Sequence, residues 1–350
     1  MTEVLDFIDP HIHLWDQLGT PRRSSPVVRL FGWSRPLLLF VMRNAFPSDL
    51  VNFFGASPDV VSDYMPPDHR QDATVAGMRL KGVVHVQAGW EGRGPLGSAG
   101  ETAWLDGLEG GPLGIVGHAD LSKGAAVGAL LDAHMEASKA FRGVRDMLAH
   151  HPSRKVHSFC ARGDMMSSPE FRGGLAQVAA RGLSFDAWCY HHQLPALASM
   201  AAALPELPIV LCHLGTPIAV GGPYGDQGLS ERARRDALSQ WRDGLAQVAE
   251  QPNVVAKISG LTMPALGWGY HQRPQPPSVD ELADDLRPLV AHALSVFGAE
   301  RCMFASNFPV DRVSVPYETL YRAFLKLADE LAPGSRQQLF HDTASAFYRL

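Results

Sequence analysis

Two histidines stand one residue apart behind an apolar segment near the start of the chain. They are His11 and His13 in D-P-H-I-H-L-W, residues 9–15. On an extended strand, residues i and i+2 point to the same face, so the two rings present nitrogens to one point. That geometry suits a divalent metal. An isolated H-x-H pair is more often two hydrogen-bonded histidines, so the remaining polar residues must decide between these interpretations.

Polar side chains also stand on or at the ends of four later apolar segments, and we expect them to converge with the first pair. They are Arg142 and Arg145 in F-R-G-V-R-D, His191 and His192 in H-H-Q-L, His213 in L-C-H-L-G-T-P, and Asn307 and Asp311 in S-N-F-P-V-D. Clustered histidines with a carboxylate or carboxamide are typical of a catalytic or metal site.

The two arginines are three residues apart, so on a strand they face opposite ways, and the sequence does not say which points inward. An inward Arg142 or Arg145 predicts a bidentate clamp on a substrate carboxylate. The alternative is an ion pair with Asp146 or Asp120.

Eight short apolar segments, separated by stretches of helical periodicity, must position these residues. The predicted strands are residues 5–9, 81–87, 114–119, 141–146, 183–188, 208–213, 253–259 and 302–306. The predicted helices include residues 125–137, 171–180, 229–249, 279–296 and 317–331. Near-continuous apolar strands alternating with amphipathic helices predict a parallel sheet covered on both sides. Eight units favour one (β/α)₈ TIM barrel over residues 1–350. An open doubly wound sheet fits less well, because no glycine-rich phosphate loop follows the first strand.

Two insertions are expected over the carboxyl end of this barrel. Residues 17–80 form a long insertion between the first and second strands, and residues 262–278 follow the seventh strand. Long loops at this end usually shape the substrate pocket, so we predict that residues 17–80 act as a lid. Trp33 or Trp268, together with His271, is then expected within reach of the substrate. The alternative is that the insertion only packs on the barrel wall.

Composition limits the classes of protein. The 350 residues are 46% hydrophobic and 19% charged, and 31 basic against 36 acidic residues give a net charge of −5. No basic stripe supports nucleic-acid binding, and the apolar run at residues 37–42 is too short to span a membrane. The acidic start differs from a signal peptide, and four dispersed cysteines indicate reduced thiols. We expect a cytoplasmic protein that acts on a small molecule, and the sequence is compatible with a homo-oligomer.

The ordered motifs D-P-H-I-H-L-W, F-R-G-V-R, L-C-H-L-G-T-P, K-I-S-G-L and R-C-M-F-A-S-N-F-P-V resemble the amidohydrolase superfamily. The similarity is to its amidohydrolase-related branch, which includes sugar-lactone and pyrone-dicarboxylate lactonases and, more distantly, nonoxidative decarboxylases. This resemblance implies that His11, His13 and His213 hold a metal, most readily zinc. It also implies a fifth-strand histidine, for which His192 is the better match and His191 the alternative.

The chain departs from this pattern at Asn307, where the family usually has an aspartate that binds metal or accepts the proton of the attacking water. Asparagine offers a carbonyl oxygen but neither charge nor basicity. We therefore predict weak, partly occupied or absent metal. The proton acceptor would then be a histidine or Asp311.

These observations favour a hydrolase that opens a small carboxylated or hydroxylated lactone or ester with activated water. One alternative is a decarboxylase or hydratase on the same scaffold, because a fold does not fix a reaction. Another is a non-catalytic barrel that has lost its eighth-strand aspartate. Retention of every strand-end histidine argues against the last.

Overall fold

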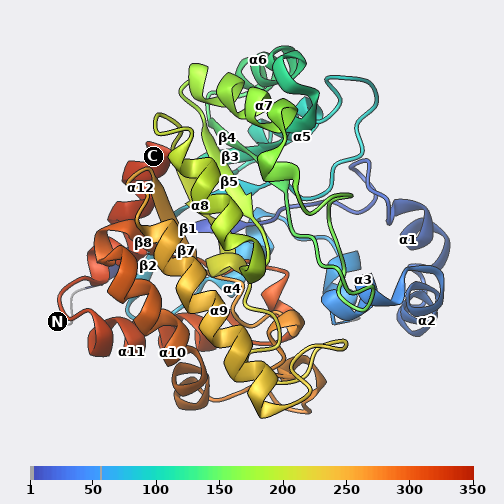
Figure 1. Ribbon diagram of the computed structural model, residues 1–350. Helices are drawn as coiled ribbons and strands as arrows, with labels where there is room; N and C mark the ends of the chain where they lie inside the picture. The colour runs from blue at the N-terminus through green and yellow to red at the C-terminus, as the bar shows by residue number, and fades with distance from the viewer. Residues whose placement is uncertain (1–3, 56) are drawn as a thin grey trace.

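A computed structural model describes residues 4–55 and 57–350 of the chain. Eight parallel strands form one sheet in sequence order, so the predicted (β/α)₈ barrel is confirmed (Figure 1). The strands are β1 (Leu5–Ile12), β2 (Met78–Val86), β3 (Gly114–His118), β4 (Phe141–Met147), β5 (Ser184–Trp188), β6 (Ile209–Leu211), β7 (Val254–Ile258) and β8 (Cys302–Phe304).

The first and last strands meet through the segments that carry the site residues. Ile12 forms a parallel bridge with Phe308. The His13 amide donates to the Phe308 carbonyl at 2.8 Å, and the Asn307 amide donates to the His11 carbonyl at 2.9 Å. Closure of the barrel therefore brings the two histidines of the N-terminal motif beside Asn307, almost 300 residues later in the sequence.

Helices cover the outside of the barrel. They are α5 (Ala99–Asp106), α6 (Gly128–Ala137), α7 (Pro169–Ala180), α8 (Leu194–Ala202), α9 (Glu231–Ala249), α10 (Val279–Phe297) and α11 (Tyr317–Leu331), whereas α12 (Thr343–Tyr348) lies at one end of the barrel. Serine side chains accept backbone amide hydrogens at the starts of three of them, at Ser168, Ser230 and Ser278. Such N-caps satisfy amide groups that the first helical turn leaves unpaired.

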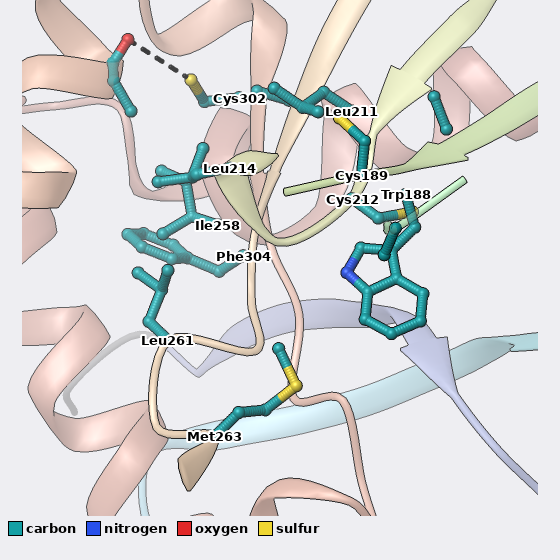
Figure 2. Close-up of a cluster of buried hydrophobic side chains, with 14 of the residues drawn as sticks. Trp188, Cys189, Leu211, Cys212, Leu214, Ile258, Leu261, Met263, Cys302 and Phe304 are labelled. Atoms are coloured by element: carbon teal, nitrogen blue, oxygen red, sulfur yellow. Dashed lines mark hydrogen bonds between the residues drawn. The ribbon is translucent and has the colours of Figure 1, made fainter. Parts of the chain in front are cut away.

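Buried apolar side chains occupy two regions. In the larger one, helices pack on the outer face of the strands, as where Phe304 stacks on Phe324 of α11 with ring centroids 4.4 Å apart. Figure 2 shows the part of this region near β5 to β8, where Trp188 and Ile258 are buried. The smaller cluster contains Ile8, Val84, Val86, Val116, Val210, Met303, Ala344 and Tyr348. Side chains from opposite strands meet in it, so it fills the barrel interior, and α12 closes one end.

The described part of the segment between β1 and β2 contains four short α-helices. They are α1 (Ser25–Phe31), α2 (Arg35–Ala45), α3 (Ser48–Phe53) and α4 (Pro66–Asp72). Figure 1 shows α1, α2 and α3 beside the barrel rather than among its covering helices. Within the described residues, no helix combines the length and apolar character needed to cross a membrane.

Candidate active site

One cavity of about 280 Å³ lies between the barrel and the inserted helices. Polar side chains from the strand ends form its floor: His13, Gln87, Arg145, His213 and Asn307. Its walls are mostly apolar and come largely from α2, α3 and the residues that follow them. The cavity is therefore polar at the barrel end and apolar along its length. It is also near the lower end of the volumes typical of small-ligand pockets.

His13 presents an unprotonated ring nitrogen at this floor. Its Nδ1 lies 2.7 Å from the carbonyl oxygen of Val86, which can only accept, so Nδ1 carries the proton. Burial lowers the pKa of His13 well below its ordinary value, with further lowering from the nearby Arg145. The ring is therefore neutral near pH 7, and its Nε2 has a free lone pair. That Nε2 lies 3.3 Å from Asn307 Oδ1.

Asn307 is held in place by a carboxylate behind it. Its Nδ2 donates to Asp311 Oδ1 at 3.0 Å, so the amide oxygen faces His13. Asp311 also accepts from the Thr262 hydroxyl at 2.8 Å. Burial raises the pKa of Asp311 to about 7, although hydrogen bonds from Thr262 and Asn307 oppose that rise. Asp311 does not line the cavity, so it positions Asn307 and lacks direct access to a ligand.

His213 follows β6 in a strained backbone. Its φ of 57° and ψ of 31° lie in the left-handed region, which residues with a Cβ rarely adopt. Its Nδ1 lies 2.9 Å from the Ser259 hydroxyl. A Cβ on Gly260 would come within 2.5 Å of the same Nδ1, so the ring and the β7 end fit only with glycine there.

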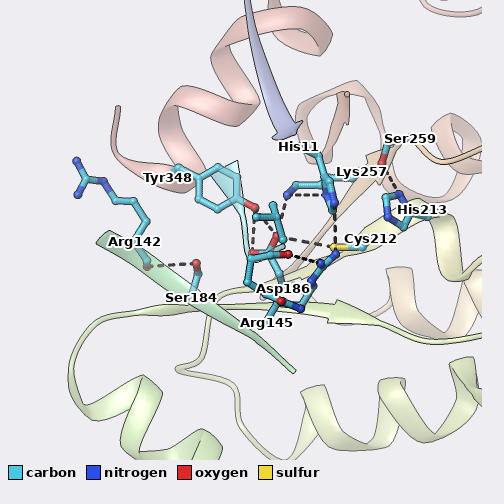
Figure 3. Close-up of polar contacts among 12 residues, drawn as sticks. His11, Arg142, Arg145, Ser184, Asp186, Cys212, His213, Lys257, Ser259 and Tyr348 are labelled. Atoms are coloured by element: carbon cyan, nitrogen blue, oxygen red, sulfur yellow. Dashed lines mark hydrogen bonds and ion pairs between the residues drawn. The ribbon is translucent and has the colours of Figure 1, made fainter. Parts of the chain in front are cut away.

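Of the two arginines on β4, Arg145 points into the barrel and Arg142 points away from it (Figure 3). Arg145 is 6% exposed and lines the cavity. Its Nη2 donates to the Gln87 carbonyl at 2.7 Å, whereas its buried Nε has no partner within the described residues. Among the described residues, no carboxylate lies within ion-pair distance of Arg145, so neither Asp146 nor Asp120 pairs with it. Arg142 instead donates to backbone carbonyls beside β4.

A buried group of charged side chains lies inside the barrel, next to these residues (Figure 3). Lys257 Nζ donates to Asp186 Oδ2 at 2.7 Å, and the Tyr348 hydroxyl donates to the same carboxylate at 2.8 Å. Lys257 also lies 3.4 Å from His11 Nδ1, and Arg145 Nη1 lies 3.5 Å from His11 Nε2. Two cations thus surround one carboxylate and a neutral ring. The excess positive charge favours an anionic ligand or a developing oxyanion.

Sequence reasoning missed Lys257, Asp186, Gln87 and Tyr348 as parts of this arrangement. A usable signal was present for two of them. Lys257 in V-V-A-K-I and Asp186 in S-F-D-A-W interrupt otherwise uncharged segments. A charge in the middle of a buried parallel strand requires a partner inside the protein.

Other predicted residues lie outside the cavity. His191 and His192 line a different surface depression, and the His191 ring accepts the Ile218 amide at 3.2 Å. Trp33 is 81% exposed. Trp268 donates to the Leu261 carbonyl, and His271 lines a third depression. The structure therefore brings none of these five side chains to the site, because both insertions reach the cavity through other residues.

A parallel barrel whose strand ends surround one cavity with histidines, an arginine and an amide has the architecture of a (β/α)₈ enzyme. A family model described as amidohydrolase matches residues 8–350. The uncharacterised protein y4mH of Sinorhizobium fredii is 33% identical over 350 residues, 98% of each chain. The chain therefore belongs to the amidohydrolase family and is a hydrolase of that family.

Two further relatives carry more specific names. An L-fucono-1,5-lactonase of Burkholderia ambifaria is 29% identical over 243 residues, which are 67% of this chain and 70% of the lactonase. The crystal structure of an amidohydrolase from Burkholderia multivorans with bound HEPES is 25% identical, with a TM-score of 0.67 over 98% of this chain and 99% of that one. A second crystal structure of that amidohydrolase contains bound zinc, at 24% identity and a TM-score of 0.65 over the same shares.

The zinc in that relative raises the question of which side chains could hold a metal here. Across the part of the chain that the structure describes, one group of three brings its ligand atoms within 4.8 Å of one another: His11, Asp186 and Cys212. It shares only His11 with the predicted set. The rings of the predicted set, His11, His13 and His213, nevertheless lie together. The centroid of the His11 ring is 5.0 Å from that of His13 and 4.5 Å from that of His213.

The chemistry of the group of three does not fit a divalent cation. Asp186 already pairs with Lys257. Both nitrogens of His11 face cationic N–H groups, so in the neutral ring one accepts a hydrogen bond and the other carries the proton. Burial raises the pKa of the Cys212 thiol to about 12, which disfavours the thiolate that zinc binds. His11 and Asp186 are therefore committed to the protein's own cations, and the Cys212 thiol donates to Asp186.

Proposed function

We propose that this amidohydrolase opens a lactone or ester by attack of water on the carbonyl carbon. One observation carries the proposal. The free acceptors His13 Nε2 and Asn307 Oδ1 converge at 3.3 Å on the floor of a cavity that Arg145 and Gln87 also line, and each of these two side chains has a buried donor without a partner among the described residues. Ester hydrolysis needs both kinds of group at one place: acceptors for the attacking water and donors for the carbonyl oxygen.

The acceptors define the position of the nucleophile. A water molecule has two protons to donate, and two acceptors 3.3 Å apart suit one water that bonds to both. As the water oxygen attacks, His13 Nε2 takes one proton. The carbon–oxygen bond of the lactone or ester then breaks, and His13 returns the proton to the leaving oxygen. The product is a hydroxy acid, or an acid and an alcohol.

The donors define the position of the carbonyl oxygen. Arg145 Nε and Gln87 Nε2 are buried and lack partners among the described residues. Unpaired buried donors are costly, so a ligand oxygen that accepts from them is strongly favoured. The buried charge of Lys257 and Arg145, against Asp186 alone, stabilises the negative charge that develops on this oxygen.

The lactonase name of the Burkholderia ambifaria relative supports the same reaction class. The test is acid release from a panel of lactones and aryl esters, followed with a pH indicator, beside carbon dioxide release from aromatic acids. We expect acid release by the wild type. Arg145→Met should lower kcat/KM by roughly 10²–10³-fold, whereas Arg142→Met, the outward arginine of the same strand, should leave it unchanged. Carbon dioxide release without any lactone or ester hydrolysis would overturn the proposal in favour of a decarboxylase.

A further inference from the structure

The walls of the cavity have an unusual composition for a site that acts on sugars. Seven apolar side chains from α2, α3 and their flanking residues line it: Leu39, Met42, Phe46, Leu50, Val51, Phe53 and Phe54. On the barrel side, Phe159 and Trp188 line it with ring centroids 4.6 Å apart. An apolar surface therefore continues from the inserted helices to the barrel.

Polar side chains are concentrated at the floor. Beyond the floor, the polar side chains in the lining include Arg22, Ser24 and Arg43. The Ser24 hydroxyl already donates to Gln17 at 2.7 Å. The Arg22 guanidinium lies over the Trp15 ring at 4.8 Å, although its buried Nε lacks a hydrogen-bond partner among the described residues. A polyhydroxylated ring needs donors and acceptors around its whole edge, and hydroxyl groups placed against these walls would lose their hydrogen bonds to water.

From this asymmetry we infer the substrate class: a lactone or ester whose body is an alkyl or aryl group without hydroxyl substituents. The inference rests on the proposed function. The carbonyl group lies at the floor against Arg145 and Gln87, and the apolar body lies along the side chains of α2 and α3. The insertion between β1 and β2 thus selects the substrate, while the barrel supplies the reaction.

The first experiment measures kcat/KM for δ-valerolactone, δ-hexalactone, δ-octalactone and glucono-δ-lactone. Burial of one methylene favours binding about fourfold, so δ-octalactone should exceed δ-valerolactone by up to roughly 60-fold, and glucono-δ-lactone should be the poorest substrate. A preference for glucono-δ-lactone, or no dependence on chain length, would overturn the inference and leave the proposed hydrolysis intact.

Calorimetric titration with butanoate, hexanoate and octanoate separates the two proposals, because binding needs no turnover. We expect affinity to rise about fourfold with each methylene. If no lactone is hydrolysed but octanoate binds much more tightly than butanoate, the proposed function fails and the apolar specificity stands. Equal affinities would overturn the specificity.

Two variants of the same helix locate the effect. Met42 faces the cavity, whereas Phe40 is 64% exposed and does not line it. Met42→Gln should lower the ratio of kcat/KM for δ-octalactone to that for δ-valerolactone at least about fivefold, because the amide is buried without a partner. Phe40→Gln should leave the ratio unchanged. If the ratio of the two kcat/KM values were the same in both variants and the wild type, α2 would not determine the preference for apolar substrates.

Discussion

Replacing Asp311 by asparagine tests the electrostatics of the site through protein stability. In the folded protein, burial raises the pKa of Asp311 to about 7, whereas the ordinary value of 3.8 applies in the unfolded chain. Between these values the folded state binds more protons, so this carboxyl group makes stability fall as pH rises. The gap from 3.8 to about 7, at 1.36 kcal/mol per pK unit, means that ~4 kcal/mol is lost above pH 7. Asparagine cannot ionise and avoids this loss.

Urea unfolding from pH 4 to pH 8.5 gives the free energy of unfolding of each protein. The effect is measured as the value for the variant minus the value for the wild type. This difference should be smallest near pH 4 and should grow by up to ~4 kcal/mol above pH 7. The hydrogen bond from Asn307 can persist in the variant, because an amide oxygen accepts it, and a change in the bonds to Thr262 would shift the variant's stability equally at every pH. Asp236→Asn, at a 72% exposed side chain, is the control and should show no such change. A flat difference for Asp311→Asn would refute the assigned pKa.

Substitutions at three further positions test individual parts of the site. Asn307→Ala should lower kcat/KM by about 5- to 150-fold, the equivalent of ~1–3 kcal/mol. Unchanged kinetics in this alanine variant would count against the role assigned to Asn307. Asn307→Asp should tighten metal binding without raising turnover. Lys257→Met leaves Asp186 buried without its cation and should cost ~3–5 kcal/mol in urea unfolding, which a loss below ~1 kcal/mol would contradict. Gly260→Ala introduces a Cβ against the His213 ring at a residue whose φ is +62°, so we expect kcat to fall. A kcat equal to that of the wild type would show that the ring has room to move.

The barrel was predictable because its strands and helices have different periodicities. Each of the eight predicted apolar segments overlaps one strand, and the five predicted helices overlap α6, α7, α9, α10 and α11. Among the helices outside the predicted ranges, α8 has the sequence L-P-A-L-A-S-M-A-A, which is apolar on nearly every face. Such a segment has no amphipathic pattern to detect, and its burial depends on the whole fold.

The site was only partly predictable. The sequence shows which residues follow a strand, but it does not show how deeply each side chain is buried or where it points. His11 and His13 share a face as the spacing implied, yet His13 reaches the cavity and His11 lies among Lys257, Arg145 and Asp186. His191 and His192 follow β5 but lie in a turn that points to another depression. The choice between Arg142 and Arg145 required the register of β4 against its neighbours, which no local pattern contains.

The most direct test of the account is the rate of acid release from δ-octalactone by protein dialysed against a chelator and checked for metal by elemental analysis. We predict that dialysis leaves kcat/KM unchanged and that His13→Asn lowers it by roughly 10²–10⁴-fold, as expected for loss of a general base. Activity that disappears on dialysis and returns with zinc, or a His13→Asn variant as active as the wild type, would contradict the assignment of His13 as the group that accepts the proton of the attacking water.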